Sequence, residues 1–309
     1  MEKIYAEILM ATYNGERFVR QQLDSLLAQD DDRWHLTVSD DGSTDSTPQI
    51  LDEYAAAHPD KITRHISGTR FGNARDHFFH LMETCDAPYM LFCDQDDVWY
   101  PGKVRTTLDA LIRTQEKHGA DTPVLVFTDQ TPVDMNLSPI APSLMRYQQQ
   151  DASVIDYRRI LLQNIVTGCA TGINRALAQR SARLQNRADT IMHDWWVGVV
   201  AAKFGQLVYL DESTMAYRQH GSNSVGAKDV GSLSHVIEKL SHLDKLKKTI
   251  AQKKRQAQAF ADTYANELSE EDIAFLRQLA KPHSGLGFYL KHRGLFTGIF
   301  RFAGTALLG

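Results

Sequence analysis

The sequence has few of the features that mark secreted, zinc-binding or membrane-spanning proteins. It holds three cysteines in 309 residues, at positions 85, 93 and 169, and no Cys-x-x-Cys pair. An odd, sparse set of cysteines does not suggest a disulfide framework, and the missing pair argues against a structural zinc site. No window of 18 uncharged apolar residues occurs in the chain, so we expect no simple membrane-spanning helix.

The first residues also lack the pattern of a secretory signal peptide. The apolar stretch over 4–10 is short and contains Glu7, whereas a signal peptide needs an uninterrupted apolar core. Together with the unpaired cysteines, this favours a cytoplasmic location.

A strong excess of charge of one sign is missing too, but the charge is unevenly placed. The net charge is −4, and from residue 228 onward 13 Lys and Arg face 8 Asp and Glu, which gives +5 for 228–309 and −9 for 1–227. An acidic region repels nucleic acid and suits a divalent cation, whereas a basic region suits an anionic surface. We therefore predict no nucleic-acid partner, a catalytic or binding domain over 1–227 and an extension over 228–309.

The first part of the chain alternates between two periodicities. Apolar residues make up 43% of the sequence, an ordinary globular composition. Short apolar runs typical of strands alternate with segments of helical spacing. Strands are expected over 4–11, 34–39, 62–66, 88–93 and 123–128, and helices over 18–27, 46–57, 73–84 and 102–117. This alternation predicts an α/β fold with a mainly parallel, mixed sheet flanked by helices.

The second part is less regular. We expect a long loop over 132–156, a helix over 158–165, a short strand over 167–172, helices from 175 and over 193–202, a strand over 206–210 and a loop over 213–227. Residues 231–280 are charged and helical, and 285–309 are apolar with glycines and basic residues. The extension is therefore predicted to be helical, basic and amphipathic.

Three of the predicted strands end in polar clusters: Thr12–Asn14, Asp40–Asp41 and Asp94–Asp97. In sheets of this type ligands bind beyond the carboxyl ends of the strands. If the three strands are neighbours, the clusters converge on one crevice.

The cluster at Asp94 carries the sharpest chemical signal. On a strand, residues two apart face the same side, so Asp94 and Asp96 are expected to project together. Two carboxylates on one face repel unless a cation lies between them, and a hard cation that also binds phosphates fits such a pair. The alternative is that Asp97 merely caps the helix from 102.

Asp194 opens the helix over 193–202 and is followed by two tryptophans. A carboxylate at a helix start is favoured as a cap and by the helix dipole. Alternatively, Trp195 and Trp196 provide a stacking face for a sugar and desolvate the acid, which raises its pKa toward that of a general base. Simple packing in the core is the other interpretation of the tryptophans, and we expect it for at least one of them. His193 is a second candidate for the base.

Three segments together resemble family 2 glycosyltransferases: Ile8–Asn14, Ser39–Ser46 and Phe92–Trp99. Thr167–Cys169, His193–Trp196 and Tyr217–Gly221 resemble the rhamnosyltransferase-like branch. The resemblance covers roughly residues 4–226. It implies a nucleotide-sugar-dependent, inverting enzyme with the A-type α/β fold.

The resemblance also implies roles for single residues. Asp41 matches the carboxylate that contacts the nucleobase, with Thr12 and Asn14 lining the base pocket, and Arg70 and Asn73 match loosely a donor-binding segment.

Further along the chain, Asp94 and Asp96 match the DxD pair that binds Mn²⁺ or Mg²⁺ with the diphosphate, and Asp194 matches the general base. His220 resembles a histidine that completes the metal shell or touches the phosphates. Arg218, next to it, is a candidate partner for phosphate.

Two other functions are compatible with parts of this pattern. A nucleotidyltransferase on a related fold also binds a nucleotide and Mg²⁺, but no glycine-rich basic loop follows the first strand. A non-catalytic nucleotide-sugar-binding protein is the other alternative. The resemblance favours a rhamnose donor and a glycan or lipid-linked acceptor.

The sequence is compatible with more than one contact for the tail over 285–309. Its aromatic and basic residues suit a membrane interface at the inner face of the plasma membrane. Docking on the protein's own domain, or on a second copy in a homodimer, fits equally.

Overall fold

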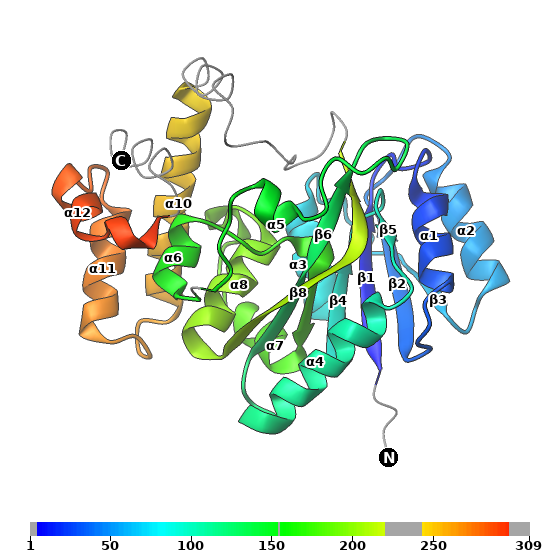
Figure 1. Cartoon of the computed structure of the whole chain (residues 1–309), viewed down its shortest axis with the longest axis horizontal. Coiled ribbons are helices and arrows are strands. Elements are labelled where there is room, and N and C mark those ends of the chain that lie inside the picture. Colours follow the sequence, from blue (N-terminus) through cyan, green and yellow to red (C-terminus); the bar gives the residue numbers. More distant parts are fainter. Residues whose placement is uncertain (1–4, 154, 220–242, 297–309) are drawn as a thin grey trace.

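The computed structural model describes residues 5–153, 155–219 and 243–296 (Figure 1). A single sheet of eight strands crosses the molecule, and helices cover both of its faces. The strand order is β3-β2-β1-β4-β7-β6-β8-β5. The strands are β1 (Ala6–Thr12), β2 (Trp34–Asp40), β3 (Ile62–His65), β4 (Tyr89–Cys93), β5 (Val98–Trp99), β6 (Val124–Val133), β7 (Thr171–Asn174) and β8 (Gln206–Arg218).

The sheet is mixed, as predicted, and its first half is parallel. β1 lies between β2 and β4 and pairs in parallel with both, with Thr12 opposite Asp40 and Met10 opposite Cys93. β7 runs antiparallel to both β4 and β6, and β5 runs antiparallel to β8. The ends of β1, β2 and β4 are therefore neighbours at one edge, where the sequence analysis expected a crevice.

The helices follow the predicted alternation with small shifts at their ends. The first part contains α1 (Val19–Leu27), α2 (Thr47–Ala57), α3 (Ala74–Thr84) and α4 (Lys103–His118). The second part contains α5 (Leu144–Tyr147), α6 (Tyr157–Leu162), α7 (Arg175–Ser181) and α8 (His193–Phe204), with short 3-10 turns η1 (Gly168–Ala170) and η2 (Arg187–Asp189).

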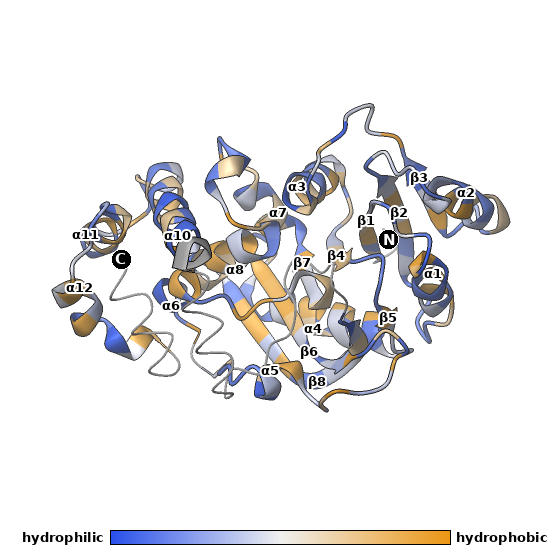
Figure 2. Cartoon of the chain, turned by 90° about the horizontal axis from the view of Figure 1, so that it is seen from above, coloured by the Kyte–Doolittle hydropathy of each residue, from blue (hydrophilic) through white to orange (hydrophobic). Residues whose placement is uncertain are grey.

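Alternate residues of the strands enter two different cores. Ile8 and Met10 of β1 pack with α1, α2 and α4, whereas Leu9 belongs to the cluster formed with α3, α7 and α8. This period of two is what a strand buried on both faces requires. The sheet is thus held between two apolar layers (Figure 2).

Some predicted boundaries were wrong. β8 continues through Arg218, although residues 213–218 were predicted to lie in a loop, because they pair with β6 beyond a register shift. The predicted loop over 132–156 contains α5, and the short strand β5 was not predicted. These errors lie where pairing depends on residues distant in the sequence.

The C-terminal extension is helical, as predicted. It comprises α10 (Leu243–Thr263), α11 (Glu270–Ala280), α12 (Leu286–Lys291) and η3 (Arg293–Leu295). In Figure 2, α10 and α11 carry both blue and orange residues, as amphipathic helices do. The domain boundary predicted at 227 lies outside the described residues.

The extension shares a core with the sheet domain. Phe260 and Tyr264 of α10 are fully buried and contact Trp196 of α8 through their rings. Asp272 of α11 accepts hydrogen bonds from Tyr157 and Arg158 of α6 and from Lys203 of α8. Burial alone would raise the pKa of the Asp272 carboxyl, but these hydrogen bonds outweigh it and lower the pKa.

The described part of the tail folds back on these helices. Tyr289 is fully buried and Phe288 packs against Phe275, whereas Leu286 and Leu290 are exposed. No helix in the described part of the chain is both long enough and apolar enough to cross a bilayer. Residues 297–309, the rest of the predicted amphipathic tail, lie outside the described residues.

Candidate active site

A cavity of about 420 Å³ opens at the carboxyl ends of β1, β2 and β4. It lies within the size range of small-molecule sites. Its lining combines four carboxylates with a single guanidinium, and the lining residues are Ala11, Thr12, Tyr13, Asp41, Arg70, Gly72, Asn73, Ala74, His77, Phe78, Asp94, Gln95, Asp96, Thr167, Gly168, Met192, His193, Asp194 and Tyr217. So acidic a lining favours a cation, or a ligand that arrives with one.

Asp94 and Asp96 both line the cavity, although not for the reason expected. β4 ends at Cys93, and Asp94–Asp97 form a turn rather than a continued strand. The argument that alternate strand residues face one side was therefore wrong, because the strand ends earlier. The turn itself directs both side chains to the cavity.

Asp97 does not cap the helix that follows. The N-cap of α4 is Gly102, which has no side chain for this purpose. Instead, Asp97 is fully buried, and its Oδ1 accepts the backbone N–H of Arg218 at 3.0 Å. Its Oδ2 has no hydrogen-bond partner among the described residues. The carboxylate thus fastens the end of β8 to the turn.

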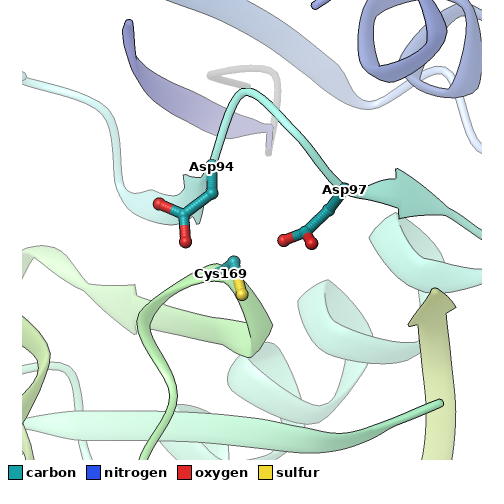
Figure 3. Close-up of side chains that lie close together, drawn as sticks. All are labelled: Asp94, Asp97 and Cys169. Carbon is teal, nitrogen blue, oxygen red and sulfur yellow. The ribbon is translucent and has the colours of Figure 1, made fainter. Parts of the chain in front are cut away.

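Asp94, Asp97 and Cys169 point toward one another below this turn (Figure 3). Each offers one ligand atom, and these atoms lie within 4.8 Å of one another. Burial and the charges of Asp96 and Asp194 raise the pKa of Asp94 to about 7, and burial also raises the pKa of the Cys169 thiol well above its usual range.

The carboxylates at this turn fit a hard divalent cation, whereas the protonated thiol of Cys169 does not contribute a ligand. A cation would relieve the repulsion between the carboxylates, and their oxygens are the ligands that Mn²⁺ and Mg²⁺ prefer. Asp94 and Asp96, with Asp97 beneath them, are the residues that would hold it. His220, the third predicted ligand, lies outside the described residues.

Asp41 is buried below the loop that connects β3 to α3. Its Oδ1 accepts the N–H of Phe71 at 2.5 Å and its Oδ2 accepts the N–H of Gly72 at 2.7 Å. Gly72 has a φ of +72°, a conformation that favours glycine. The carboxylate therefore shapes this wall of the cavity, and its role toward a nucleobase stays a prediction.

The other residues predicted for the base pocket play different parts. Thr12 lines the cavity and donates its hydroxyl to Asp40 at 2.8 Å. Asn73 lines it too and caps α3, accepting the N–H of Asp76 at 2.9 Å. Asn14 is not among the lining residues. Its side chain accepts the N–H of Thr44 and so ties two loops together.

Tyr13 and Arg70 form an exposed pair at the rim. The guanidinium lies 5.3 Å from the ring centre and donates to the phenol oxygen at 3.1 Å. Gln95 holds the backbone of Tyr13 on both sides, accepting its N–H at 2.9 Å and donating to its carbonyl at 3.0 Å. The result is a fixed aromatic surface beside Asp41.

Asp194 lines the opposite wall, at the start of α8. Its Oδ2 accepts the N–H of Gly168 at 3.0 Å and its Oδ1 accepts the N–H of Trp195 at 2.6 Å. Burial raises the pKa of Asp194 to about 6, even though these two N–H groups act in the opposite direction. A carboxylate with this pKa is ionised at neutral pH and suited to accept a proton.

The two tryptophans do not form the expected stacking face. Trp196 is fully buried and donates to the carbonyl of Ser181, and Trp195 donates to the carbonyl of Ile160 at 2.6 Å. Neither is among the residues that line the cavity. Both rings are turned into the protein because α6, α7 and α10 cover that side of α8.

The structure also places Arg218 differently from the prediction that it faces a phosphate. Its side chain is buried and donates to the carbonyl of Asp96 at 2.8 Å, to the carbonyl of Met135 at 2.6 Å and to Oε1 of Gln21 at 2.7 Å. The guanidinium also lies over the ring of Phe18. It is not a lining residue, so it supports the turn Asp94–Asp97 rather than facing a phosphate.

Sequence reasoning missed several lining residues, among them Gln95, Phe78 and Tyr217. Gln95 stands inside the DxD turn, so its position alone gave a signal that was not used. Phe78 reaches the cavity only through the packing of α3, which no local pattern reveals. Tyr217 begins the segment Tyr217–Gly221 noted in the sequence, but it was not proposed as a site residue.

Comparison with known proteins places this geometry in a family. The model of glycosyl transferase family 2 matches residues 7–181. The chain belongs to this family. It is therefore a glycosyltransferase, and the match confirms the resemblance found in the sequence.

Individual relatives agree with this assignment. The chain is 29% identical to the dTDP-rhamnosyl transferase RfbG of Shigella flexneri over 71% of its own length and 74% of the relative. It is 25% identical to a putative teichuronic acid biosynthesis glycosyltransferase of Bacillus subtilis over 55% of its length and 61% of that protein.

Solved structures confirm the fold. Staphylococcus aureus TarS 1–349, in complex with UDP-GlcNAc, superposes with a TM-score of 0.56 over 98% of this chain and 90% of that one, at 13% identity. A mannosyltransferase from Pyrobaculum calidifontis in complex with GDP-Man and Mn²⁺ gives a TM-score of 0.51 over 98% and 86%, at 17% identity. The A-type fold predicted for the glycosyltransferase is thus present.

Proposed function

We propose that this glycosyltransferase is an inverting, metal-dependent enzyme that transfers a sugar, with rhamnose favoured, from a nucleoside diphosphate to a glycan or lipid-linked acceptor in cell-surface polysaccharide synthesis. The observation that carries the proposal is the convergence of Asp41, Asp94, Asp96 and Asp194 on one cavity in a family 2 chain. The identity to a dTDP-rhamnosyl transferase supports the donor sugar.

The nucleotide belongs at the wall formed by Tyr13, Asp41, Arg70 and Asn73. The Tyr13–Arg70 pair offers an aromatic and cationic surface to a base, and Thr12 lies beside it. Asp41 is buried below and keeps the loop in shape. This arrangement suits a flat heterocycle with a ribose at the cavity mouth.

The diphosphate belongs between this wall and the turn at Asp94. With four carboxylates and one guanidinium in the lining, a bare diphosphate would be repelled. A bound Mn²⁺ or Mg²⁺ would neutralise the charge that develops on the departing diphosphate. Asp94 and Asp96 would hold the ion, and Asp97 and Arg218 keep their turn in place. His220 stays a predicted third ligand.

Asp194 is the general base of the proposed reaction. It accepts the proton of the acceptor hydroxyl while that oxygen bonds to the anomeric carbon, and the bond from that carbon to the phosphate oxygen breaks with its electron pair going to the nucleoside diphosphate. Attack from the face opposite the leaving group inverts the configuration. The N–H groups of Gly168 and Trp195 hold the carboxylate in one orientation.

The acceptor and the surroundings are further proposals. A lipid-linked acceptor fits a protein at the inner face of the plasma membrane, with contact through residues 285–309. The exposed Leu286 and Leu290 next to Lys291 support such contact. A homodimer through the same tail is the alternative arrangement.

A donor panel tests the proposed function. The protein is incubated with Mn²⁺ and dTDP-rhamnose, UDP-sugars or GDP-mannose, with water as the acceptor of the sugar, and the nucleoside diphosphate released by this hydrolysis is measured with and without EDTA. We expect metal-dependent release, strongest with dTDP-rhamnose, and its loss in Asp94→Asn. Release of pyrophosphate would identify a nucleotidyltransferase instead, and no release with any donor would leave only a binding protein.

A further inference from the structure

His193 is the most deeply buried titratable group in the wall that carries Asp194. It is the first residue of α8, lines the cavity and is 4% exposed. Its ring stacks on Phe78 with 4.3 Å between ring centres, and meets Phe92 edge-on at 4.9 Å. Two aromatic contacts at nearly right angles fix the plane of the imidazole.

The polar atoms of this ring are not used within the protein. Neither Nδ1 nor Nε2 has a hydrogen-bond partner in the part of the chain that the structure describes. A buried polar atom without a partner destabilises the folded state, and such atoms are uncommon in folded proteins. Two in one ring, at the wall of a cavity, indicate that a ligand supplies the partners.

The chemistry of that ligand follows from the state of the ring. Burial lowers the pKa of His193 to about 3, so the imidazole is neutral and offers one N–H donor and one acceptor nitrogen. A hydroxyl group both donates and accepts, and therefore matches it. The carboxylate of the next residue, Asp194, disfavours an anion at this place.

The surroundings favour a sugar as the carrier of that hydroxyl. Phe78 and Met192 line the cavity around His193 and provide apolar surface for the C–H groups of a sugar ring. Nor does His193 belong to the group of possible metal ligands found among the described residues, which consists of Asp94, Asp97 and Cys169.

Gly168 keeps the approach to this ring open. A Cβ at this position would lie 3.1 Å from Nε2 of His193, closer than ordinary contact. The N–H of the same glycine binds Asp194. One backbone position thus serves both the base and the neighbouring imidazole.

We propose that His193 is a specificity-determining residue that hydrogen-bonds a hydroxyl group of a sugar substrate next to the carboxylate of Asp194. This inference rests on the proposed function, because it needs a sugar in the cavity. The hydroxyl belongs either to the transferred sugar or to the acceptor, which present the same chemistry.

The test compares His193→Phe and His193→Gln with the wild type. Phenylalanine retains the stacking on Phe78 but removes both nitrogens, whereas glutamine restores a donor and an acceptor. We expect His193→Phe to weaken the binding of one sugar substrate about fivefold to 100-fold, with partial recovery in His193→Gln. His58→Phe is the control, since this histidine meets the ring of Tyr54 and is not among the residues that line the cavity.

Two measurements locate the hydroxyl. Calorimetry compares the affinity for the nucleoside diphosphate with that for the nucleotide-sugar, and steady-state kinetics give the KM of the acceptor. If the affinity for the nucleotide-sugar falls while the affinity for the nucleoside diphosphate does not, the hydroxyl belongs to the transferred sugar. If the KM of the acceptor rises, the hydroxyl belongs to the acceptor. Both outcomes support the proposal, whereas values within twofold of wild type for both substrates overturn it.

A second variant tests the proposal independently, in case His193→Phe does not fold. Gly168→Ala places a methyl group next to Nε2 and leaves the N–H to Asp194 in place. It should weaken sugar binding while the nucleoside diphosphate binds as before, and unchanged sugar binding would count against the proposal. A wild type that releases no nucleoside diphosphate from any donor refutes the proposed function itself.

Discussion

The two walls of the cavity differ in how the polar side chains compared here are hydrogen-bonded and desolvated by the protein. In the wall formed by the loops after β1, β2 and β3, the side chains of Thr12, Asp41 and Asn73 are hydrogen-bonded within the protein. In the wall at the start of α8, the pKa of Asp194 is raised by burial and the ring of His193 has no partner among the described residues. We call these the loop wall and the helix wall.

The difference indicates a division of labour. Groups that are already satisfied fix the shape of the loop wall, which suits the binding of a rigid nucleotide. Unsatisfied or desolvated groups are costly to fold, and they persist where a substrate or a reaction makes use of them. Substitutions in the two walls should therefore affect different quantities.

The largest effect is expected from Asp194→Asn in the helix wall. The amide keeps the shape of the side chain but cannot accept a proton, so kcat should fall about 10²–10⁴-fold. Calorimetry should show unchanged affinity for the nucleotide. Asp262→Asn, an exposed carboxylate on α10, is the control, and near-normal turnover in Asp194→Asn would remove this residue from the mechanism.

In the loop wall, Asp41→Asn should act on binding and stability instead. One of the two N–H groups of Phe71 and Gly72 loses its acceptor, which costs about 1–3 kcal/mol. We expect weaker nucleotide binding and a lower Tm, with kcat at saturating donor nearly retained. Asp52→Asn, an exposed carboxylate paired with Arg64, is the control. A fall in kcat alone would erase the distinction between the walls.

The pH dependence of kcat tests the role of Asp194 in the helix wall directly. Asp194 must be ionised to take a proton, so kcat at saturating donor and Mn²⁺ should fall about tenfold per pH unit below pH 6 and be level above it. In Asp194→Asn, the fall of kcat below pH 6 should be absent. A profile that is flat from pH 5 to 8 in the wild type would exclude a base with this pKa.

The smallest effect is expected at the rim of the loop wall. Arg70→Ala removes the cation from the Tyr13 ring and the hydrogen bond to its hydroxyl. An exposed cation–π contact is worth about 0.5–1 kcal/mol, so nucleotide affinity should drop about twofold to fivefold. Arg70→Lys should retain part of it. A hundredfold loss would instead place the guanidinium on the phosphates.

The loop wall was also the easier one to predict from the sequence. Its residues follow β1, β2 and β3, which alternate with helices along the chain, and the rule that ligands bind at the carboxyl ends of parallel strands brought Thr12 and Asp41 together with Asp94. The exact geometry was less accessible. β4 stops at Cys93, so a turn and not a strand places Asp94 and Asp96.

The helix wall depends on long-range packing. A helix start with Asp194 was visible, but which side of α8 faces the cavity is decided by α6, α7 and α10. The sequence therefore suggested Trp195 and Trp196 as a sugar platform, whereas the structure turns both inward. Likewise, the continuation of β8 to Arg218 rests on pairing with β6, more than 80 residues away.

The aromatic contact between α8 and α10 has a consequence for where the chain can be shortened. Phe260 and Tyr264 cover Trp196 on the same helix that carries Asp194. A truncation before α10 would strip that cover and leave a large indole open to solvent. We therefore expect the smallest stably folded unit to be longer than the 7–181 segment that the family model matches, and to include the C-terminal helices that sequence alone would assign to a detachable extension.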